Sequence, residues 1–352
     1  MNQTAVIGMS GGVDSAVAAL LLKEQGFCVI GVTMRLLCGK LSASASHADR
    51  DAADAAAVCA RLGIPHRAPD FSAAFETQVV DRFAAEYAAG RTPNPCVLCN
   101  RAVKFGVLWE YARALGADCL ATGHYASVRQ DPETGRFQLL ADESAKDQSY
   151  VLYGLTQEQL AHIRFPLSGK TKEEVRRLAE AHALPIAHKS DSMDICFVPD
   201  GDHSAFLRRY TGREMPPGEF ADTSGRVLGT HRGLDRYTVG QRKGLGLSAG
   251  KPLYVLRLDA AQNRVIVGGE DEQYTASLTA SDCNFVSIAP PTAPIRVTAR
   301  VRYHAAPAEA LLTPLENNRF RLDFDRPQRA VAPGQAVVLY DGRLLLGGGT
   351  ID

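Results

Sequence analysis

The sequence lacks any apolar run long enough to cross a membrane as a helix. Such a span needs about 20 apolar residues, and no run in the 352 residues approaches that length. The first ten residues also lack the basic cluster and long apolar stretch of a secretory signal. We therefore expect a cytoplasmic protein that does not act at a membrane.

Net charge is also absent. The 39 Lys and Arg are balanced by 39 Asp and Glu, which argues against a protein coated in positive charge. Residues 201–257 are an exception, with 10 basic and 5 acidic side chains and hence a local excess of +5. Two interpretations stay open for this stretch: a solvated surface, or a local surface for nucleic acid.

Two common cofactor motifs are missing. A Walker A loop requires G-x-x-x-x-G-K-[ST], but Gly169-Lys170-Thr171 has Arg164 at the first glycine position and no predicted strand before it. A four-cysteine zinc site needs two C-x-x-C pairs, and only Cys96 and Cys99 form one. The chain has eight cysteines. In a cytosolic protein we expect most of them to be small buried residues rather than a disulfide framework.

Up to about Pro199, the sequence alternates short apolar strands with amphipathic helices. The predicted strands are 4–9, 27–34 and 118–123, and the predicted helices are 15–25, 51–62, 72–89 and 101–115. Strands that alternate with helices indicate βαβ units and a parallel sheet, so the fold class is α/β.

The pattern changes after Pro199, where Gly and Pro become frequent and helices become scarce. Short alternating β runs at 295–302, 319–324 and 336–340 are typical of a small β-barrel or sandwich. We predict three domains. These are an α/β body at 1–199, a linker domain at 200–275 and a β domain at 276–352.

The first predicted strand is followed by the string Ser10-Gly11-Gly12-Val13-Asp14-Ser15 and then by a helix. Two successive glycines let several backbone N–H groups point into one concavity, and the helix adds its positive N-terminal end. The hydroxyls of Ser10 and Ser15 can donate to the same oxygens. Asp14 can cap the helix or help to hold Mg²⁺. The string predicts a phosphate site that works without a lysine.

Two further strings contain cysteines. In residues 92–100 two prolines favour an extended segment without helix. Cys99 follows them near the predicted helix start, where Arg101 and Lys104 favour the thiolate. In residues 190–197, Cys196 lies in a polar turn. Taken alone, the C-x-x-C pair indicates a metal half-site or a chance pair, and Cys196 a buried cysteine.

Together these strings resemble the tRNA-specific 2-thiouridylases of bacteria and mitochondria, within the PP-loop ATP-pyrophosphatase superfamily. Matching stretches follow one another in chain order across all three predicted domains, at 8–15, 92–105, 121–125, 146–153, 190–197, 237–247 and 332–339. The resemblance implies an N-terminal PP-loop domain of the Rossmann-like, adenine nucleotide hydrolase type. It also implies a small central domain that binds tRNA and a C-terminal β-barrel.

The resemblance implies a tRNA-uridine 2-sulfurtransferase. ATP would be cleaved between its α and β phosphates, and AMP would be attached to the C2 oxygen of the wobble uridine in tRNAs for lysine, glutamate and glutamine. Cys99 matches the family's nucleophile and Cys196 its persulfide carrier. Sulfur transfer would leave these two joined as a disulfide. A partner such as a cysteine desulfurase or a sulfur relay protein would supply the sulfur.

One position departs from the family's commonest motif. Three residues before the nucleophile the family often has an aspartate, and this chain has Cys96. The aspartate is thought to orient the base or move a proton, and a thiol with a reference pKa of about 8.5 can move a proton only weakly. Two routes therefore stay open: a persulfide, or a [4Fe–4S] cluster held by Cys96, Cys99 and Cys196.

The resemblance also assigns binding residues. ATP, with Mg²⁺, would contact Gly8, Met9, Ser10, Gly11, Gly12, Val13, Asp14, Ser15, Met34 and Gly123. Met34 would lie near the adenine, and Gly123 would let the nucleotide approach closely. The target uridine, flipped out of its stack, would be bordered by Asn94, Pro95 and Cys96. Further tRNA contacts would come from His124, Lys146, Asp147, Gln148, Arg302, Tyr303 and Gln335.

Two rival functions use fewer of these features. A PP-loop ligase or amidotransferase would need an ammonia source and would have no use for Cys99 and Cys196. A non-catalytic RNA-binding or iron–sulfur carrier protein would not need an intact phosphate loop. Release of AMP and pyrophosphate from ATP in the presence of unmodified tRNA would distinguish the thiolation reaction.

Overall fold

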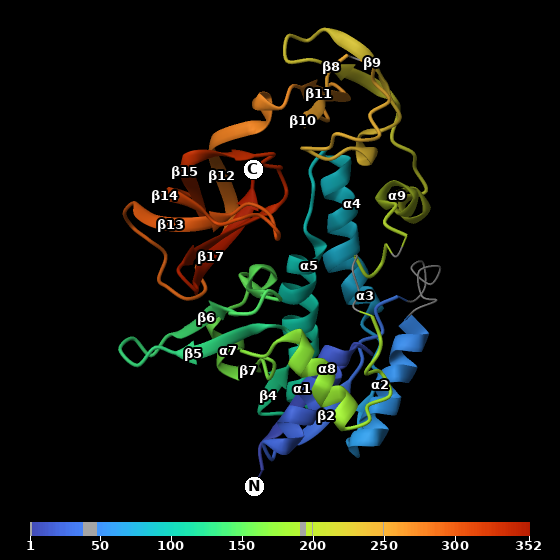
Figure 1. The fold of residues 1–352 in the computed structure, drawn as a ribbon, viewed down its shortest axis with the longest axis vertical. Coiled ribbons are helices and arrows are strands. Elements are labelled where there is room, and N and C mark those ends of the chain that lie inside the picture. The colour runs from blue at the N-terminus through green and yellow to red at the C-terminus, as the bar shows by residue number, and fades with distance from the viewer. Residues whose placement is uncertain (1, 38–47, 191–194, 199, 249) are drawn as a thin grey trace.

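A computed structural model describes residues 2–37, 48–190, 195–198, 200–248 and 250–352 of the chain. Figure 1 shows an α/β region that contains the N-terminus, a small sheet at the opposite end of the long axis, and a barrel beside them. The predicted α/β class with an added β-barrel is confirmed. Within the described ranges, no helix is both long and apolar enough to cross a membrane.

Five parallel strands form the N-terminal sheet, in the order β3-β2-β1-β4-β7. Their bounds are Thr4–Gly8 (β1), Cys28–Val32 (β2), His66–Arg67 (β3), Cys119–Ala121 (β4) and Ile163–Arg164 (β7). The central strand β1 is apolar because helices cover both of its faces. Successive side chains point to opposite faces. Accordingly, Ile7 and Val6 belong to different core clusters.

Helices pack on both faces of this sheet. One face carries α1 (Val13–Glu24), α2 (Ala48–Leu62) and α8 (Lys172–Ala181), which share a core cluster with Ile7. The other carries α6 (Leu108–Ala114), α7 (Gln157–His162) and the 3-10 turn η4 (Ser149–Leu152), which share a core cluster with Val6. This arrangement exposes the carboxyl ends of the strands, where ligands bind in open α/β sheets.

Two long helices contain π-helical segments. The first runs through α3 (Ser72–Phe75), η2 (Glu76–Val80) and α4 (Asp81–Ala88), close to the predicted 72–89. The second runs through α5 (Pro95–Leu98), η3 (Cys99–Val107) and α6. The prediction that two prolines exclude helix at this point was wrong. Pro95 occupies the first helical position, where a missing N–H costs nothing.

The central region is a four-stranded sheet with its own apolar core. Its order is β10-β11-β8-β9, with bounds Gly218–Ala221 (β8), Val227–His231 (β9), Tyr254–Asp259 (β10) and Arg264–Gly268 (β11). The helix α9 (His203–Thr211) precedes this sheet, the 3-10 turn η5 (Leu234–Arg236) lies between β9 and β10, and the 3-10 turn η6 (Asp271–Gln273) leads from β11 to the C-terminal barrel.

Six antiparallel strands form the C-terminal barrel, which closes through pairing of β12 with β17. Their bounds are Tyr274–Asn284 (β12), Ile295–Arg300 (β13), Ala308–Leu315 (β14), Arg319–Arg329 (β15), Ala336–Asp341 (β16) and Leu344–Ile351 (β17). The three β runs predicted from alternation correspond to β13, β15 and β16. Closure removes the exposed edges that an open sheet of this size would present.

The α/β region and the barrel share a sheet. A hairpin of β5 (Ala126–Gln130) and β6 (Phe137–Ala141) adds to the barrel, because β6 pairs with β17. The buried hydroxyl of Tyr150 also donates to the Ala336 carbonyl at 2.6 Å. This hairpin was not predicted, and it joins two regions that were expected to be separate domains.

Candidate active site

The phosphate loop, residues 9–15, connects β1 to α1. Gly11 has a φ of 71°, and a Cβ there would lie 2.3 Å from the carbonyl oxygen of Asp51, so only glycine fits. The Ser15 hydroxyl accepts from the Ser10 amide at 3.2 Å and donates to the Gly12 carbonyl at 3.1 Å. These bonds hold the loop in a defined shape in front of the N-terminus of α1.

Two lysines from other segments bond residues in and around this loop. Lys172 on α8 donates to both carboxylate oxygens of Asp14, at 2.7 and 2.8 Å. Lys189 donates to the Gly11 carbonyl at 3.0 Å and to Asp51 at 2.7 Å. The expectation that Asp14 caps the helix was wrong, because α1 begins after Gly12 with no side-chain cap. Asp14 instead ties α1 to α8.

The segment after β4 packs directly against the start of α1. A Cβ on Gly123 would lie 2.8 Å from the Ser15 amide nitrogen, so the glycine is required by this backbone contact. The Tyr125 hydroxyl donates to Asp14 at 2.8 Å. Gly123 was predicted to let the nucleotide approach closely, and its packing against α1 is a second reason for a glycine here.

Three cysteines from two distant segments meet beside the second long helix. We call Cys96, Cys99 and Cys196 the thiol cluster. Ionisation of Cys99 or of Cys96 would raise the pKa of Cys196, so the three sulfurs lie within electrostatic range of one another. Cys99 is buried in the apolar cluster that contains Phe197, while Cys96 and Cys196 keep accessible surface. Residues 191–194 of the Cys196 string lie outside the described residues.

The protonation of the thiol cluster differs from the prediction. Burial raises the pKa of Cys99 to about 11. Cys196 keeps some accessible surface, but the protein atoms around it still desolvate its sulfur and raise its pKa to about 12, so both groups are thiols at neutral pH. Lys104 opposes burial by lowering the pKa of all three thiols. Arg101, the other predicted cation, instead pairs with Asp282 at 2.7 Å.

The π-helical geometry explains why Lys104 faces Cys99. In an α-helix, five residues advance about 1.4 turns, which would place the two side chains on different sides. A π-helix bonds residue i to residue i+5, so Lys104 lies nearly above Cys99. Both residues fall inside the nine-residue segment η3.

His124 follows Gly123, the residue that packs against the start of α1. Its Nδ1 is 2.7 Å from the Thr122 hydroxyl, and its ring packs against Phe105 and Phe165. Burial, with the charge of Lys104, lowers its pKa well below the usual value, so the ring is neutral. Only 8% of His124 is accessible, which leaves little surface for the predicted RNA contact. Gly123 and Tyr125 therefore contact the phosphate loop, and His124 between them lies within electrostatic range of Lys104, as the thiol cluster does.

The predicted neighbours of the target base shape the start of α5. Asn94 is the helix N-cap, and its side chain accepts from the Val97 amide at 3.3 Å. Pro95 is buried and Cys96 is exposed. The Gln335 side chain donates to the Pro93 carbonyl at 3.4 Å, so the barrel contacts this segment. Met34 packs against the cluster that contains Cys99.

The remaining predicted tRNA residues line the junction with the barrel. Asp147 accepts from Arg300 at 3.2 Å, and its carbonyl accepts from the Tyr303 hydroxyl at 2.9 Å. Gln148 accepts from the Tyr125 amide at 3.2 Å, and Lys146 is exposed. Arg302 donates to the carbonyls of Val239 and Ala330. Most of these side chains are therefore engaged in joining regions of the protein. Tyr303 also lies within electrostatic range of Cys96.

Across the described ranges, no group of three or more His, Cys, Asp or Glu side chains is arranged to hold a metal ion.

Known proteins match the chain along its length. Three families match consecutive parts: a tRNA methyl transferase HUP domain at residues 3–200, a tRNA methyl transferase PRC-barrel domain at 204–269, and an aminomethyltransferase β-barrel domain at 275–351. A tRNA-specific 2-thiouridylase MnmA of Acetivibrio thermocellus is 48% identical over 360 residues, which cover 98% of each chain. One of Acidithiobacillus ferrooxidans is 50% identical over 351 residues, which cover 99% of this chain and 98% of its own. The chain belongs to the tRNA-specific 2-thiouridylase family.

For this member of the 2-thiouridylase family, sequence reasoning missed Lys172, Lys189 and Tyr125. The string Thr171-x-x-Glu174 did carry a signal, since it forms a capping box that starts α8. No local sequence pattern, however, indicated that Lys172, the first residue of α8, would pair with Asp14. The PP-loop class itself, with helices on both sides of a parallel sheet, agrees with family membership.

Proposed function

We propose that this protein is a tRNA-uridine 2-sulfurtransferase, which uses ATP to adenylate the C2 oxygen of a wobble uridine and then replaces that oxygen with sulfur. The observation that supports the proposal is the position of residues 123–125. Gly123 and Tyr125 touch the phosphate loop, and His124 shares Lys104 with the thiol cluster. An activated oxygen and a sulfur donor can therefore meet at one place.

The phosphate loop would bind ATP through its backbone amides and the N-terminal end of α1. We expect Mg²⁺ to be held mainly by the phosphates, because Lys172 already occupies both oxygens of Asp14. Attack of the uridine oxygen on the α phosphate would release pyrophosphate. The bound AMP then makes C2 electrophilic and supplies a good leaving group.

The thiol cluster would carry the sulfur. A persulfide on Cys196 attacks C2 with its terminal sulfur, and AMP departs. Cys99 then attacks the inner sulfur, which leaves the outer sulfur on the uridine and joins Cys99 to Cys196 as a disulfide. A sulfur-donor protein, such as a cysteine desulfurase or a sulfur relay protein, would load Cys196. We expect the wobble uridines of tRNAs for lysine, glutamate and glutamine as substrates, in the cytoplasm.

Mass analysis of tRNA nucleosides tests this function. With ATP and a sulfur donor, the protein should form 2-thiouridine and release AMP and pyrophosphate. Cys99→Ser and Cys196→Ser should abolish the product while ATP still binds. Cys28→Ser, at an exposed cysteine of β2, is the matched control and should remain active. Release of ADP would overturn the adenylation step, and full thiolation by either serine variant would remove that cysteine from the mechanism.

An iron–sulfur route remains the alternative, because Cys96 adds a third thiol where the family often has aspartate. An anaerobic absorption spectrum separates the two routes. An active but colourless protein supports the persulfide, whereas a broad visible band lost in Cys96→Ala supports the cluster.

A further inference from the structure

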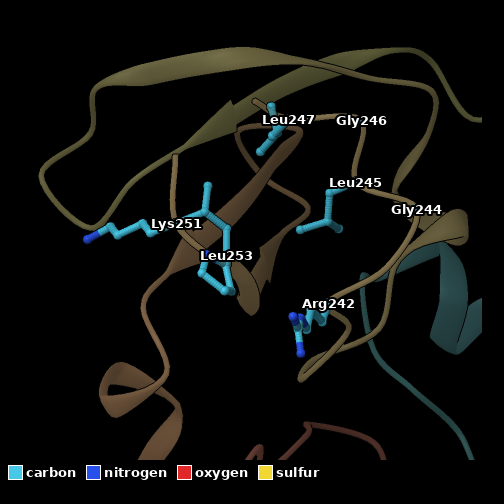
Figure 2. A pocket seen from close by; sticks show the side chains of 8 residues that line it. Arg242, Gly244, Leu245, Gly246, Leu247, Lys251 and Leu253 are labelled. Atoms are coloured by element: carbon cyan, nitrogen blue, oxygen red, sulfur yellow. The ribbon is translucent and has the colours of Figure 1, made fainter. Parts of the chain in front are cut away.

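One reactive side chain of the site, the Cys96 thiol, has no step in the sulfur transfer described above. A pocket of about 240 Å³ in the central region offers no comparable group, because the described residues that line it include neither a cysteine nor a carboxylate. Figure 2 shows leucine side chains there, between Arg242 and Lys251. The covalent chemistry that is still unassigned therefore lies in the thiol cluster.

Cys96 and Cys99 lie about one turn apart on the same helix. Cys96 is the second residue of α5, and Cys99 follows Leu98 with helical φ and ψ angles of −61° and −44°. Residues three apart on a helix share a face, and helical geometry places their Cα atoms about 5 Å apart. A disulfide needs Cα atoms about 4.4 to 6.8 Å apart. The backbone at this position is therefore compatible with a Cys96–Cys99 disulfide.

The two cysteines differ in exposure. Cys96 is exposed, whereas only 8% of Cys99 is accessible, and Cys99 packs in the apolar cluster that contains Phe197. The Cys99–Cys196 disulfide, with which the sulfur transfer ends, would include this buried sulfur. A dissolved reductant attacks such a sulfur slowly, because exchange depends on access. A thiol held one turn away on the same helix acts at a much higher effective concentration.

Lys104 favours an exchange among these sulfurs. Burial raises the pKa of Cys96 and of Cys196, and the positive charge of Lys104 opposes this rise in both. Thiol–disulfide exchange begins with an attacking thiolate and ends with a departing thiolate. One cation therefore stabilises both the attacking group, if it is Cys96, and the departing group, if it is Cys196.

We propose that Cys96 is a further catalytic residue, which resolves the disulfide left by sulfur transfer. The Cys96 thiolate attacks the Cys99 sulfur, so that a Cys96–Cys99 bond forms and the Cys99–Cys196 bond breaks. Cys196 departs as a thiolate and takes up a proton, with no net oxidation or reduction of the protein. Two molecules of a dissolved thiol then reduce the more accessible Cys96–Cys99 disulfide and become a disulfide themselves. The inference rests on the proposed function for the origin of the first disulfide.

Peptide mapping after a single turnover tests this exchange. Trypsin leaves Cys96 and Cys99 together in the peptide 92–101 and releases Cys196 in the peptide 190–208. After one turnover without reductant, followed by alkylation, the wild type should contain an internal disulfide in 92–101 and an alkylated Cys196. Cys96→Ser should instead contain the two peptides joined to each other. The control Cys28→Ser, at an exposed cysteine of β2, should match the wild type. Joined peptides as the only disulfide product of the wild type would rule the exchange out.

The turnover rate gives a second readout, which a purely structural role of Cys96 would not change. With glutathione as the only reductant, Cys96→Ser should lower the ratio of the steady-state rate to the first-turnover rate at least about fivefold. Cys28→Ser should keep the wild-type ratio, and an unchanged ratio in Cys96→Ser would refute the role of Cys96.

Failure of the proposed function has a different signature, since the wild type would then form no 2-thiouridine even in the first turnover. Diamide oxidation of the protein alone would still test the exchange in that case. An internal disulfide in the peptide 92–101 is the expected product, and exclusive joining of 92–101 to 190–208 would contradict the inference.

Discussion

At the scale of single residues, Lys104 is the side chain that links the two halves of the site. Its positive charge lowers the pKa of all three cysteines and of His124. Burial alone would keep the thiols protonated, and a buried thiolate or persulfide anion needs a cation to offset its desolvation. Lys104 supplies that charge without a carboxylate partner among the described residues.

We therefore predict that Lys104→Met slows alkylation of Cys99 and Cys196. Burial raises the pKa of Cys99 to about 11. Loss of the cation raises this pKa further, and the thiolate fraction at pH 8 falls with it. The rate measured by mass spectrometry should drop about three- to tenfold, since one pKa unit is a tenfold change in thiolate. The pH dependence should shift to higher pH.

Arg101→Met is the control for this experiment. Arg101 lies three residues before Lys104 in the same helical segment, but its guanidinium pairs with Asp282, so alkylation should be unchanged. Equal rates in both variants would mean that Lys104 does not act on the thiols.

At the scale of elements, the helix that begins at Pro95 positions the thiol cluster. Asn94 caps it, Cys96 lies in its first turn, and η3 brings Lys104 over Cys99. The helix begins at Pro95 rather than at the predicted residue 101, and the sequence Asn94-Pro95 is a helix-start pattern that could have indicated this. The π-helical segment was not predictable, because it depends on packing against neighbouring elements rather than on local propensity.

Asn94→Ala should cost about 1 kcal/mol of unfolding free energy, because the first turn loses its side-chain cap. Fraying of that turn should also speed alkylation of Cys96. Thr156→Ala removes the comparable capping box of α7. This variant should cost a similar free energy of unfolding without changing the alkylation rate of Cys96. Urea unfolding and alkylation rates provide the two readouts. If both variants change the alkylation rate of Cys96 equally, the Asn94 cap has no specific role at the site.

At the scale of the whole molecule, the barrel and the α/β region should unfold together. They share the pairing of β6 with β17 and the buried hydrogen bond from Tyr150 to Ala336. Tyr303 and Gln335 of the barrel also reach the thiol cluster and the segment before α5. The site is therefore complete only when the barrel is in place.

Tyr150→Phe should lower the unfolding free energy by about 1 to 2 kcal/mol, since the buried Ala336 carbonyl loses its donor. Tyr274→Phe, at a tyrosine that is 48% exposed, should leave stability nearly unchanged. Urea unfolding followed by both fluorescence and circular dichroism should give coincident transitions for these two regions. A separate early transition of the barrel would show that the shared sheet does not couple them.

The sequence by itself determined the phosphate loop, the parallel α/β sheet and the β run of the C-terminal region. Each depends on local rules: glycines that permit a tight turn, apolar periodicity, and turn residues between strands. The tertiary structure alone decided which distant groups meet. It places Lys172 on Asp14, Cys196 beside Cys99 and the barrel against Pro93. It also decided the protonation of the thiols, because desolvation depends on how many atoms from other segments surround a group, and no local pattern encodes that.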